Sequence, residues 1–438
     1  MTTLGRRLRA MRIERGLSQA QVAGTLTRAA VSAVELGHIW PSVDTLDTMT
    51  RGLGLPDGYF YELYLSETDG EAHLLAFGQR CFERGMGDLA RRAMAKLVAI
   101  SRSKGRNRMV TEVLWRLGLW ALAEGRTQTA LATFQACLDR AMAERDWARV
   151  VRIHLRLAEL EQAEGRRVEL LERLMTARHL LAWVEEEERE LRLAVQRRLG
   201  DLCLEMDFLD LAREYYQAAW QELAGAPGEA GTAPGLEGGA EAAGVALALA
   251  DVHRRRGEAA EALRWGELAA RLFAELGDEE GRARAQALCG GALADLGRFG
   301  EAREALLEAL QLLAGGERVR PLVDLVGAEL ALGGTATARQ YAAEALELAG
   351  DEPRLRGCAL RAHALALREA GAVEEAFEGF LESTALLAGA GGGSDLRRTL
   401  CEAGRALAEA EELRGSGFDR FLQRLTSTLG VEAESRTA

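Results

Sequence analysis

The amino-acid sequence predicts an all-α protein, in which a small N-terminal helix-turn-helix domain is followed by an α-solenoid of repeated helical hairpins. Three observations lead to this prediction. The 438 residues include 48 glycines but only six prolines, and 48% of residues are hydrophobic, a balance that favours many short helices ended by glycine. A set of three linked positions recurs eight times along the chain. The first 65 residues instead contain several short segments with helix caps.

The charge of the chain is divided unevenly. The formal net charge is −12, which excludes a basic surface along the whole molecule. The first 28 residues, however, contain six arginines and one glutamate, a net +5, so the remaining 410 carry −17. We therefore expect a basic head on an acidic body, and the head is the part suited to nucleic acid.

The head shows the start signals of four helices in order. Apolar Leu4, Leu8 and Met11 share one face of the first helix. Ser18 with Gln21 three residues later forms a capping box for the second, Thr27 caps the third, and Pro41 with Ser42 begins the fourth. In the third helix, Val31 and Val34 are predicted to face inward, and Arg28, Ala29, Ser32 and Ala33 outward.

The order of these residues resembles the phage-repressor-type (XRE) helix-turn-helix family, over about residues 4–65 of a domain at 1–68. The residues that carry the resemblance are Arg12, Gly16, Leu17, Ser18, Gln19, Val22, Ala23, Val31, Ser32, Glu35, Gly37, Pro41, Ser42 and Leu46. One departure is the turn before the third helix, Gly24-Thr25-Leu26-Thr27, which is about two residues shorter than usual in the family.

The resemblance implies roles for eight residues of the head. Gln19 would bind a DNA phosphate, and Arg12 with Glu35 would form an ion pair that ties the first helix to the third. The third helix, with its cap, would meet base edges in the major groove. Arg28 is its only long donor and would bind guanine, whereas the alanines offer only methyl contacts. The predicted DNA-binding residues are Gln19, Thr27, Arg28, Ala29, Ser32 and Ala33.

The body has an internal repeat at spacings of 36 to 50 residues. Small residues recur at Gly78, Gly118, Ala158, Gly200, Ala250, Gly290 and Ala364, with Val326 as the one larger member. Seven residues later stand Gly85, Gly125, Gly165, Asp207, Gly257, Gly297, Gly333 and Gly371. Twelve residues later an alanine is usual, and sixteen later a large apolar residue is common: Met94, Phe134, Leu174, Tyr216, Leu306 and Phe380.

This pattern predicts helix, turn, helix in each repeat. The small residue lets the two helices approach, the glycine ends the first helix in the left-handed conformation, and the later apolar residues bury against the first helix. The pattern resembles the tetratricopeptide (TPR) repeat in units longer than 34 residues, and we expect about eight TPR-like repeats over residues 71–388.

Two glycine-rich segments interrupt the helical pattern. Residues 225–239 predict a flexible insertion, although their glycines are also compatible with a phosphate site. Residues 389–394 predict a linker, after which residues 395–438 are expected to form C-terminal capping helices. Phe418, Phe421, Leu422, Leu425 and Leu429 predict an amphipathic helix there, which serves as a cap or a dimer contact.

A head of this type followed by TPR-like repeats resembles bacterial peptide-sensing regulators of the RRNPP kind. The resemblance implies a homodimer on operator DNA, with a signalling peptide or a partner protein in the groove of the repeats. Those grooves usually clamp the peptide backbone with asparagines, whereas this chain has a single asparagine, Asn107. Peptide sensing thus follows from the domain order alone.

The concave wall of the array is predicted to be rich in arginine. Projecting the first helix of each repeat places Arg152, Arg197, Asp201, Asp251, Arg254, Arg284, Arg320, Arg361 and Arg368 on that wall. Arg152, Arg197, Arg254, Arg284 and Arg361 are the candidate ligand-groove residues, and they suit an acidic peptide or a terminal carboxylate. The alternative is that each is a solvated arginine on an amphipathic helix.

No catalytic, metal or cofactor site is predicted. The two lysines, Lys96 and Lys104, stand in no phosphate-binding loop, and no two histidines have metal-ligand spacing. The six cysteines are far apart and are expected to be small buried residues in a reducing compartment. No signal segment or membrane span is predicted, which favours a cytoplasmic protein. Tyr59, Phe60, Tyr61 and Tyr64 predict packing between head and array.

The function expected from these observations is a sequence-specific DNA-binding transcriptional regulator whose solenoid senses a peptide or protein and mediates dimerisation. The alternative is a protein-interaction scaffold of TPR type whose helix-turn-helix head no longer binds DNA. The two differ in their salt dependence, because operator binding weakens steeply with ionic strength.

Overall fold

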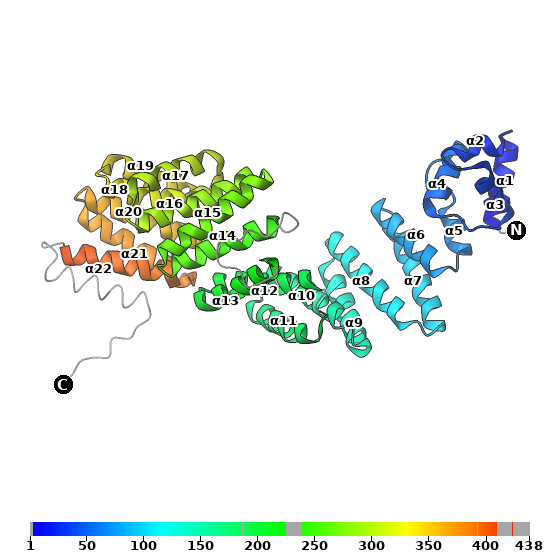
Figure 1. The fold of residues 1–438 in the computed structure, drawn as a ribbon, viewed down its shortest axis with the longest axis horizontal. Coiled ribbons are helices and arrows are strands. Elements are labelled where there is room, and N and C mark those ends of the chain that lie inside the picture. Colours follow the sequence, from blue (N-terminus) through cyan, green and yellow to red (C-terminus); the bar gives the residue numbers. More distant parts are fainter. Residues whose placement is uncertain (1–2, 186–187, 225–238, 392, 410–422, 424–438) are drawn as a thin grey trace. The chain divides into compact units, whose positions relative to one another are not determined.

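The computed structural model of the chain describes residues 3–185, 188–224, 239–391 and 393–409, together with residue 423 (Figure 1). Its contacts divide the chain into two compact units, Met1–Glu185 and Glu186–Ala438. Within the described residues all the regular elements are helices, which confirms the predicted all-α class.

The head consists of five helices at the start of the first unit. They are α1 (Thr3–Glu14), α2 (Gln19–Ala23), α3 (Arg28–Leu36), α4 (Val43–Gly52) and α5 (Tyr61–Glu67). The predicted caps form: the Ser18 hydroxyl accepts from the backbone N–H of Gln21, and the Gln21 side chain accepts from the backbone N–H of Ser18. Thr27 caps α3 through the N–H of Ala30.

An aromatic cluster joins the head to the first helical hairpin. Tyr61 and Tyr64 are buried, and both rings pack on Phe77 of α6 (Glu71–Glu83), with ring centroids 5.1 Å apart. Their hydroxyls donate to Asp47 and to the carbonyl of Pro41, 3.0 Å away in each case. The head and the first hairpin therefore share one hydrophobic core, as the aromatic residues predicted. Tyr59 is exposed and is the exception.

Helical hairpins make up the rest of the first unit and most of the described part of the second. The first unit adds α6 (Glu71–Glu83), α7 (Gly87–Ser103), α8 (Asn107–Ala123), α9 (Thr127–Glu144), α10 (Trp147–Ala163), α11 (Arg167–Leu180) and a short 3-10 helix (Leu181–Trp183). The second contains α12 (Arg189–Glu205), α13 (Leu209–Ala224), α14 (Gly239–Arg255), α15 (Ala259–Leu276), α16 (Glu279–Asp295), α17 (Phe299–Leu312), a 3-10 turn (Gly315–Arg318), α18 (Val319–Ala331), α19 (Thr335–Ala349), α20 (Pro353–Glu369), α21 (Val373–Gly389) and α22 (Gly393–Glu409).

In six of the eight hairpins, the small residue of the first helix is followed sixteen positions later by a large apolar residue on the second helix. The hairpin of α14 and α15 has Gly266 at that position. A Cβ added to Gly118 would stand 2.6 Å from the ring of Phe134, and one added to Gly200 would stand 2.7 Å from the ring of Tyr216. Val326 is the larger member of the series, and its partner sixteen residues on is a small one, Ala342; both are fully buried. In this hairpin the larger side chain is on the first helix and the smaller one on the second, so the combined side-chain volume of the pair stays similar.

The turn of each hairpin has the left-handed backbone that the sequence predicted. The seven glycines have φ between 71° and 86°, and they are Gly85, Gly125, Gly165, Gly257, Gly297, Gly333 and Gly371. Asp207 takes the same conformation at φ 59°. A residue with a Cβ is strained in this conformation, so glycine is the residue expected at this turn. The Asp207 side chain contacts α22 through Ser394.

The C-terminal part of the structure corrects two expectations. Residues 389–394 are not a spacer, because α21 includes Gly389 and α22 begins at Gly393, so only three residues separate two helices that pack together. Cys401 is exposed on α22, whereas the other five cysteines are buried as expected. Residues 225–238 of the predicted insertion, and the amphipathic residues Phe418 to Leu429, lie outside the described residues.

Candidate functional site

The outer face of α3 is the candidate DNA-reading surface. Thr27, Arg28 and Ala29 are exposed, Ser32 and Ala33 are half-buried, and they stand opposite the buried Val31 and Val34. The left-handed Gly37 ends the helix with hydrogen bonds to the carbonyls of Ala33 and Val34. Arg28 therefore projects from the first turn of a helix that is capped at both ends.

A buried ion pair fixes α3 against α1. Nε of Arg12 lies 2.6 Å from Oε1 of Glu35, and Nη2 lies 2.9 Å from Oε2. Glu35 is only 1% exposed. Burial alone would raise the pKa of Glu35, but the hydrogen bonds from Arg12 and Gln19 outweigh burial and lower it. The structure thus contains the pair that the sequence resemblance implied, in bidentate form.

Gln19 belongs to the same network. Its Nε2 donates to Oε2 of Glu35 over 2.9 Å, so α1, α2 and α3 are joined at one carboxylate. Arg12, Ser18, Gln19, Ala20 and Arg28 line a hollow of about 320 Å³ beside this junction. The hollow brings Gln19, the predicted phosphate ligand, next to Arg28, the predicted base ligand.

The short turn between α2 and α3 is made with a glycine. Gly24 has φ 57°, and a Cβ there would stand 3.0 Å from the methyl group of Thr48. Gly52 at the end of α4 lies against the backbone of Val22, where a Cβ would come within 2.3 Å of the carbonyl oxygen. The missing side chains let α2 and α4 come close together, and α2 also packs on α3 despite the shorter turn.

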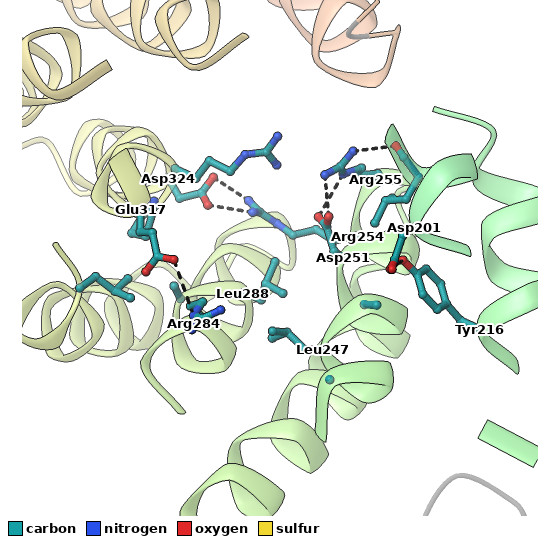
Figure 2. Close-up of a pocket in the computed structure, with 17 residues that line it drawn as sticks. Asp201, Tyr216, Leu247, Asp251, Arg254, Arg255, Arg284, Leu288, Glu317 and Asp324 are labelled. Carbon is teal, nitrogen blue, oxygen red and sulfur yellow. Dashed lines mark hydrogen bonds and ion pairs between the residues drawn. The ribbon is translucent and has the colours of Figure 1, made fainter. Parts of the chain in front are cut away.

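The second unit contains a pocket of about 500 Å³, walled mainly by the first helices of successive hairpins (Figure 2). Apolar Leu247, Leu288, Leu313 and Pro321 form part of its wall. Its charged lining residues are Asp201, Asp251, Arg254, Arg255, Arg284, Glu317, Arg320 and Asp324. Four acids and four arginines make the lining neutral overall, not basic as the sequence predicted.

Arg254 shows how this neutrality arises. Its Nη1 and Nη2 lie 2.8 and 2.6 Å from the two carboxylate oxygens of Asp324 (Figure 2). Its Nε lies 3.0 Å from Asp295. The guanidinium crosses α16 over Gly291, where a Cβ would come within 2.2 Å of it. Burial alone would raise the pKa of Asp324, but Arg254 outweighs it and lowers that pKa.

The predicted groove arginines are therefore not equivalent. Arg254 and Arg361 form ion pairs within the unit, Arg361 with Glu402 at 2.9 Å, and their role toward an acidic ligand stays a prediction. Arg284 lies at the pocket, 2.8 Å from Glu280 and 3.8 Å from Glu317. Arg197 is half exposed and lies 3.7 Å from Glu241. Arg152 belongs to α10 in the first unit, apart from the other four.

Sequence reasoning missed the acids that neutralise the wall. Asp324, Asp395 and Glu402 come from helices far along the chain, and no local spacing links them to their arginines. The sequence contains one indication of a contact between distant helices: Asp207 stands at a turn where the other repeats have glycine. The described residues include no helix long and apolar enough to span a membrane.

Comparisons with known proteins agree with this organisation. Residues 3–58 match the family described as Helix-turn-helix domain. Comparison with curated protein sequences gives no significant match. Residues 3–58 of the head thus match a helix-turn-helix domain, and the body is an array of helical hairpins with the repeat that the sequence predicted.

Several solved structures are similar to the chain. A Rap protein complexed with Competence and Sporulation Factor has 15% identity and a TM-score of 0.44, over 73% of this chain and 94% of its own. PlcR of Bacillus thuringiensis, in complex with a peptide and DNA, has 15% identity and a TM-score of 0.29, over 71% and 94%. A STAND protein with a tetratricopeptide repeat sensor from Pyrococcus horikoshii has 13% identity and a TM-score of 0.44, over 91% and 62%.

Proposed function

We propose that the protein is a sequence-specific transcriptional regulator, which reads operator DNA with α3 and senses a peptide with its second unit. The observation that carries the DNA-binding proposal is the exposed face of α3, on a domain that matches the helix-turn-helix family. Its arginine stands next to Gln19, and the helix is held by the buried Arg12–Glu35 pair. Arg28 binds guanine in the major groove and Gln19 binds a phosphate.

The test is a mobility shift of the purified protein on DNA from upstream of its own gene, with Arg28→Ala and Arg28→Lys. Arg28→Ala is expected to lose about 1–3 kcal/mol of discrimination between the operator and scrambled DNA, because it removes the contact with guanine. Arg28→Lys is expected to lose part of that discrimination, because an ammonium lacks the planar fork of the guanidinium. Arg28→Lys keeps the charge, so it retains more of the non-specific affinity than Arg28→Ala.

Arg108→Ala is the matched control, because Arg108 is an exposed arginine on α8, outside the head. It is expected to leave operator preference unchanged. Unchanged site preference in both Arg28 variants would remove Arg28 from the reading role. Absence of DNA binding by the wild-type protein would favour the alternative function, a protein-interaction scaffold.

The peptide-sensing part of the proposal rests on the pocket of the second unit. A volume of about 500 Å³ whose wall contains both apolar residues and arginines suits a few side chains of a short peptide. The protein acts as a homodimer, since two heads on one duplex read half-sites about one helical turn apart. Sedimentation with and without operator DNA measures this, and a monomer in both conditions would contradict it.

A further inference from the structure

The C-terminal helix α22 is bound to the second unit by polar contacts along its length. Oγ of Ser394 lies 2.7 Å from Asp207, and Nη2 of Arg398 lies 3.3 Å from Asp295. Glu402 accepts from Arg361 through both carboxylate oxygens at 2.9 Å. Ala403 and Ala406 pack in a cluster with α20 and α21. The helix is thus more than a cap on the last hairpin, because it contacts the first hairpin of the unit as well.

Asp207 explains why one repeat turn lacks glycine. Its carboxylate accepts from Ser394 in the first turn of α22, and Arg397 stands 3.9 Å away. A carboxylate near the N-terminus of a helix is electrostatically favourable, and glycine at this turn would offer none. The contact of Asp207 with α22 therefore offsets the strain of its left-handed backbone.

Arg320 connects α22 to the pocket. It lines the pocket from α18, and its Nη2 lies 3.6 Å from Oδ2 of Asp395, beyond hydrogen-bond distance. The Asp395 carboxylate also receives Nε of Arg354 at 3.1 Å. Burial alone would raise the pKa of Asp395, but Arg320 and Arg354 lower it. The Arg320 side chain is 38% exposed, in contrast to 14% for the fully engaged Arg254.

We propose that a carboxylate ligand bound in the pocket takes Arg320 from Asp395 and thereby loosens the first turns of α22. This inference rests on the proposed sensing function and specifies the chemistry of its ligand. The other pocket arginines are held closely: Arg254 by two aspartates, Arg255 by Asp251 at 2.6 Å, and Arg284 by Glu280 at 2.8 Å. Arg320 is the one whose ion-pair partner, Asp395 of α22, stands furthest, at 3.6 Å, and the Asp251 carboxylate in the pocket also attracts it.

The apolar residues of the pocket determine what kind of group the ligand carries beside its carboxylate. Leu247, Leu288, Leu313 and Pro321 require an apolar body next to the carboxylate. The C-terminal end of a short apolar peptide has this chemistry, and so does a medium-chain fatty acid. The carboxylate of such a ligand would compete with the Asp395 carboxylate for the guanidinium of Arg320.

The first experiment follows amide hydrogen exchange of residues 393–401 in the full-length chain. Asp395→Asn removes the charge that holds Arg320 and Arg354, so exchange in this segment is expected to rise. Glu374→Gln is the control, since Glu374 is exposed on α21 and its loss changes the net charge equally. Equal exchange in Asp395→Asn and wild type would contradict the proposal that Asp395 holds the first turns of α22 in place.

The second experiment measures binding of N-acetyl-leucyl-leucine, of its C-terminal amide and of octanoate by calorimetry. The free acid is expected to bind, to raise exchange of residues 393–401, and to bind Asp395→Asn about fivefold or more tightly than wild type. The amide is expected to bind neither protein, and Arg320→Gln to lose the acid. Octanoate binding would support the carboxylate class and show that the peptide group is dispensable.

The outcomes separate this inference from the proposed function. If no acid binds any variant, the ligand class is wrong although operator binding in the mobility shift still stands. If the acid binds wild type and Asp395→Asn equally, the pocket is a ligand site that is not coupled to α22. If the wild-type protein fails to bind DNA, the proposed function fails whatever the pocket does.

Discussion

His154 is a buried histidine in α10, and its pKa is lowered to about 4, first by burial and then by the nearby Arg173. The folded protein therefore binds fewer protons than the unfolded chain between about pH 6.5 and pH 4. Stability that is fully present above pH 6.5 is lost as the pH falls through this window.

We expect His154→Leu to reduce this pH dependence. The loss of unfolding free energy between pH 7 and pH 4.5 should be smaller in the variant by about 2–3 kcal/mol, because two pH units of linkage at one group are removed. Urea unfolding at the two pH values measures it. An equal loss in both proteins would show that His154 does not cause the acid sensitivity.

At this scale the sequence predicted the buried ion pair of the head but not the ion pairs of the body. Arg12 and Glu35 are 23 residues apart, yet their motif placed them, because the head follows a family pattern. Arg254 and Asp324 are 70 residues apart and belong to no shared motif. Which acid neutralises which arginine depends on how closely successive hairpins stack, and this is set by packing over the whole unit.

The helices of the body were predictable because every hairpin uses the same kind of turn and a similar packing of its two helices. A residue with positive φ, which is glycine in seven of the eight turns, ends each first helix, and in most hairpins a small residue makes room for a large one on the next helix. The start of α22 was not predictable in this way. Its three preceding glycines indicate a linker by composition, and only the contacts of Ser394 and Asp395 show that the helix begins at once.

The close approach of paired helices predicts opposite effects for two glycine-to-alanine changes. Gly200→Ala should destabilise the protein by about 1–3 kcal/mol, because the new Cβ would meet the ring of the buried Tyr216. Gly327→Ala is the control in α18, where the space is open, and it should stabilise by up to about 1 kcal/mol through helix propensity. Denaturant midpoints test both, and the same sign for both would contradict the packing argument.

The whole molecule combines a head of +5 in the first 28 residues with −17 in the rest. Repulsion between the acidic array and DNA should restrict docking to the head. Phosphate contacts release counterions, so even two of them should weaken binding about tenfold between about 50 and 200 mM salt. A titration of operator binding against salt measures the slope, and a slope near zero would mean that phosphate contacts do not drive binding.

The contact between Ser394 and Asp207 joins residues 187 positions apart. An open array in which each hairpin touches only its neighbours can fray from its end, one hairpin at a time. Here the last helix holds the first hairpin of the unit, so peeling away α22 also removes support from α12 and α13. The second unit should consequently melt as one cooperative block, and its stability should not be a sum over separate repeats.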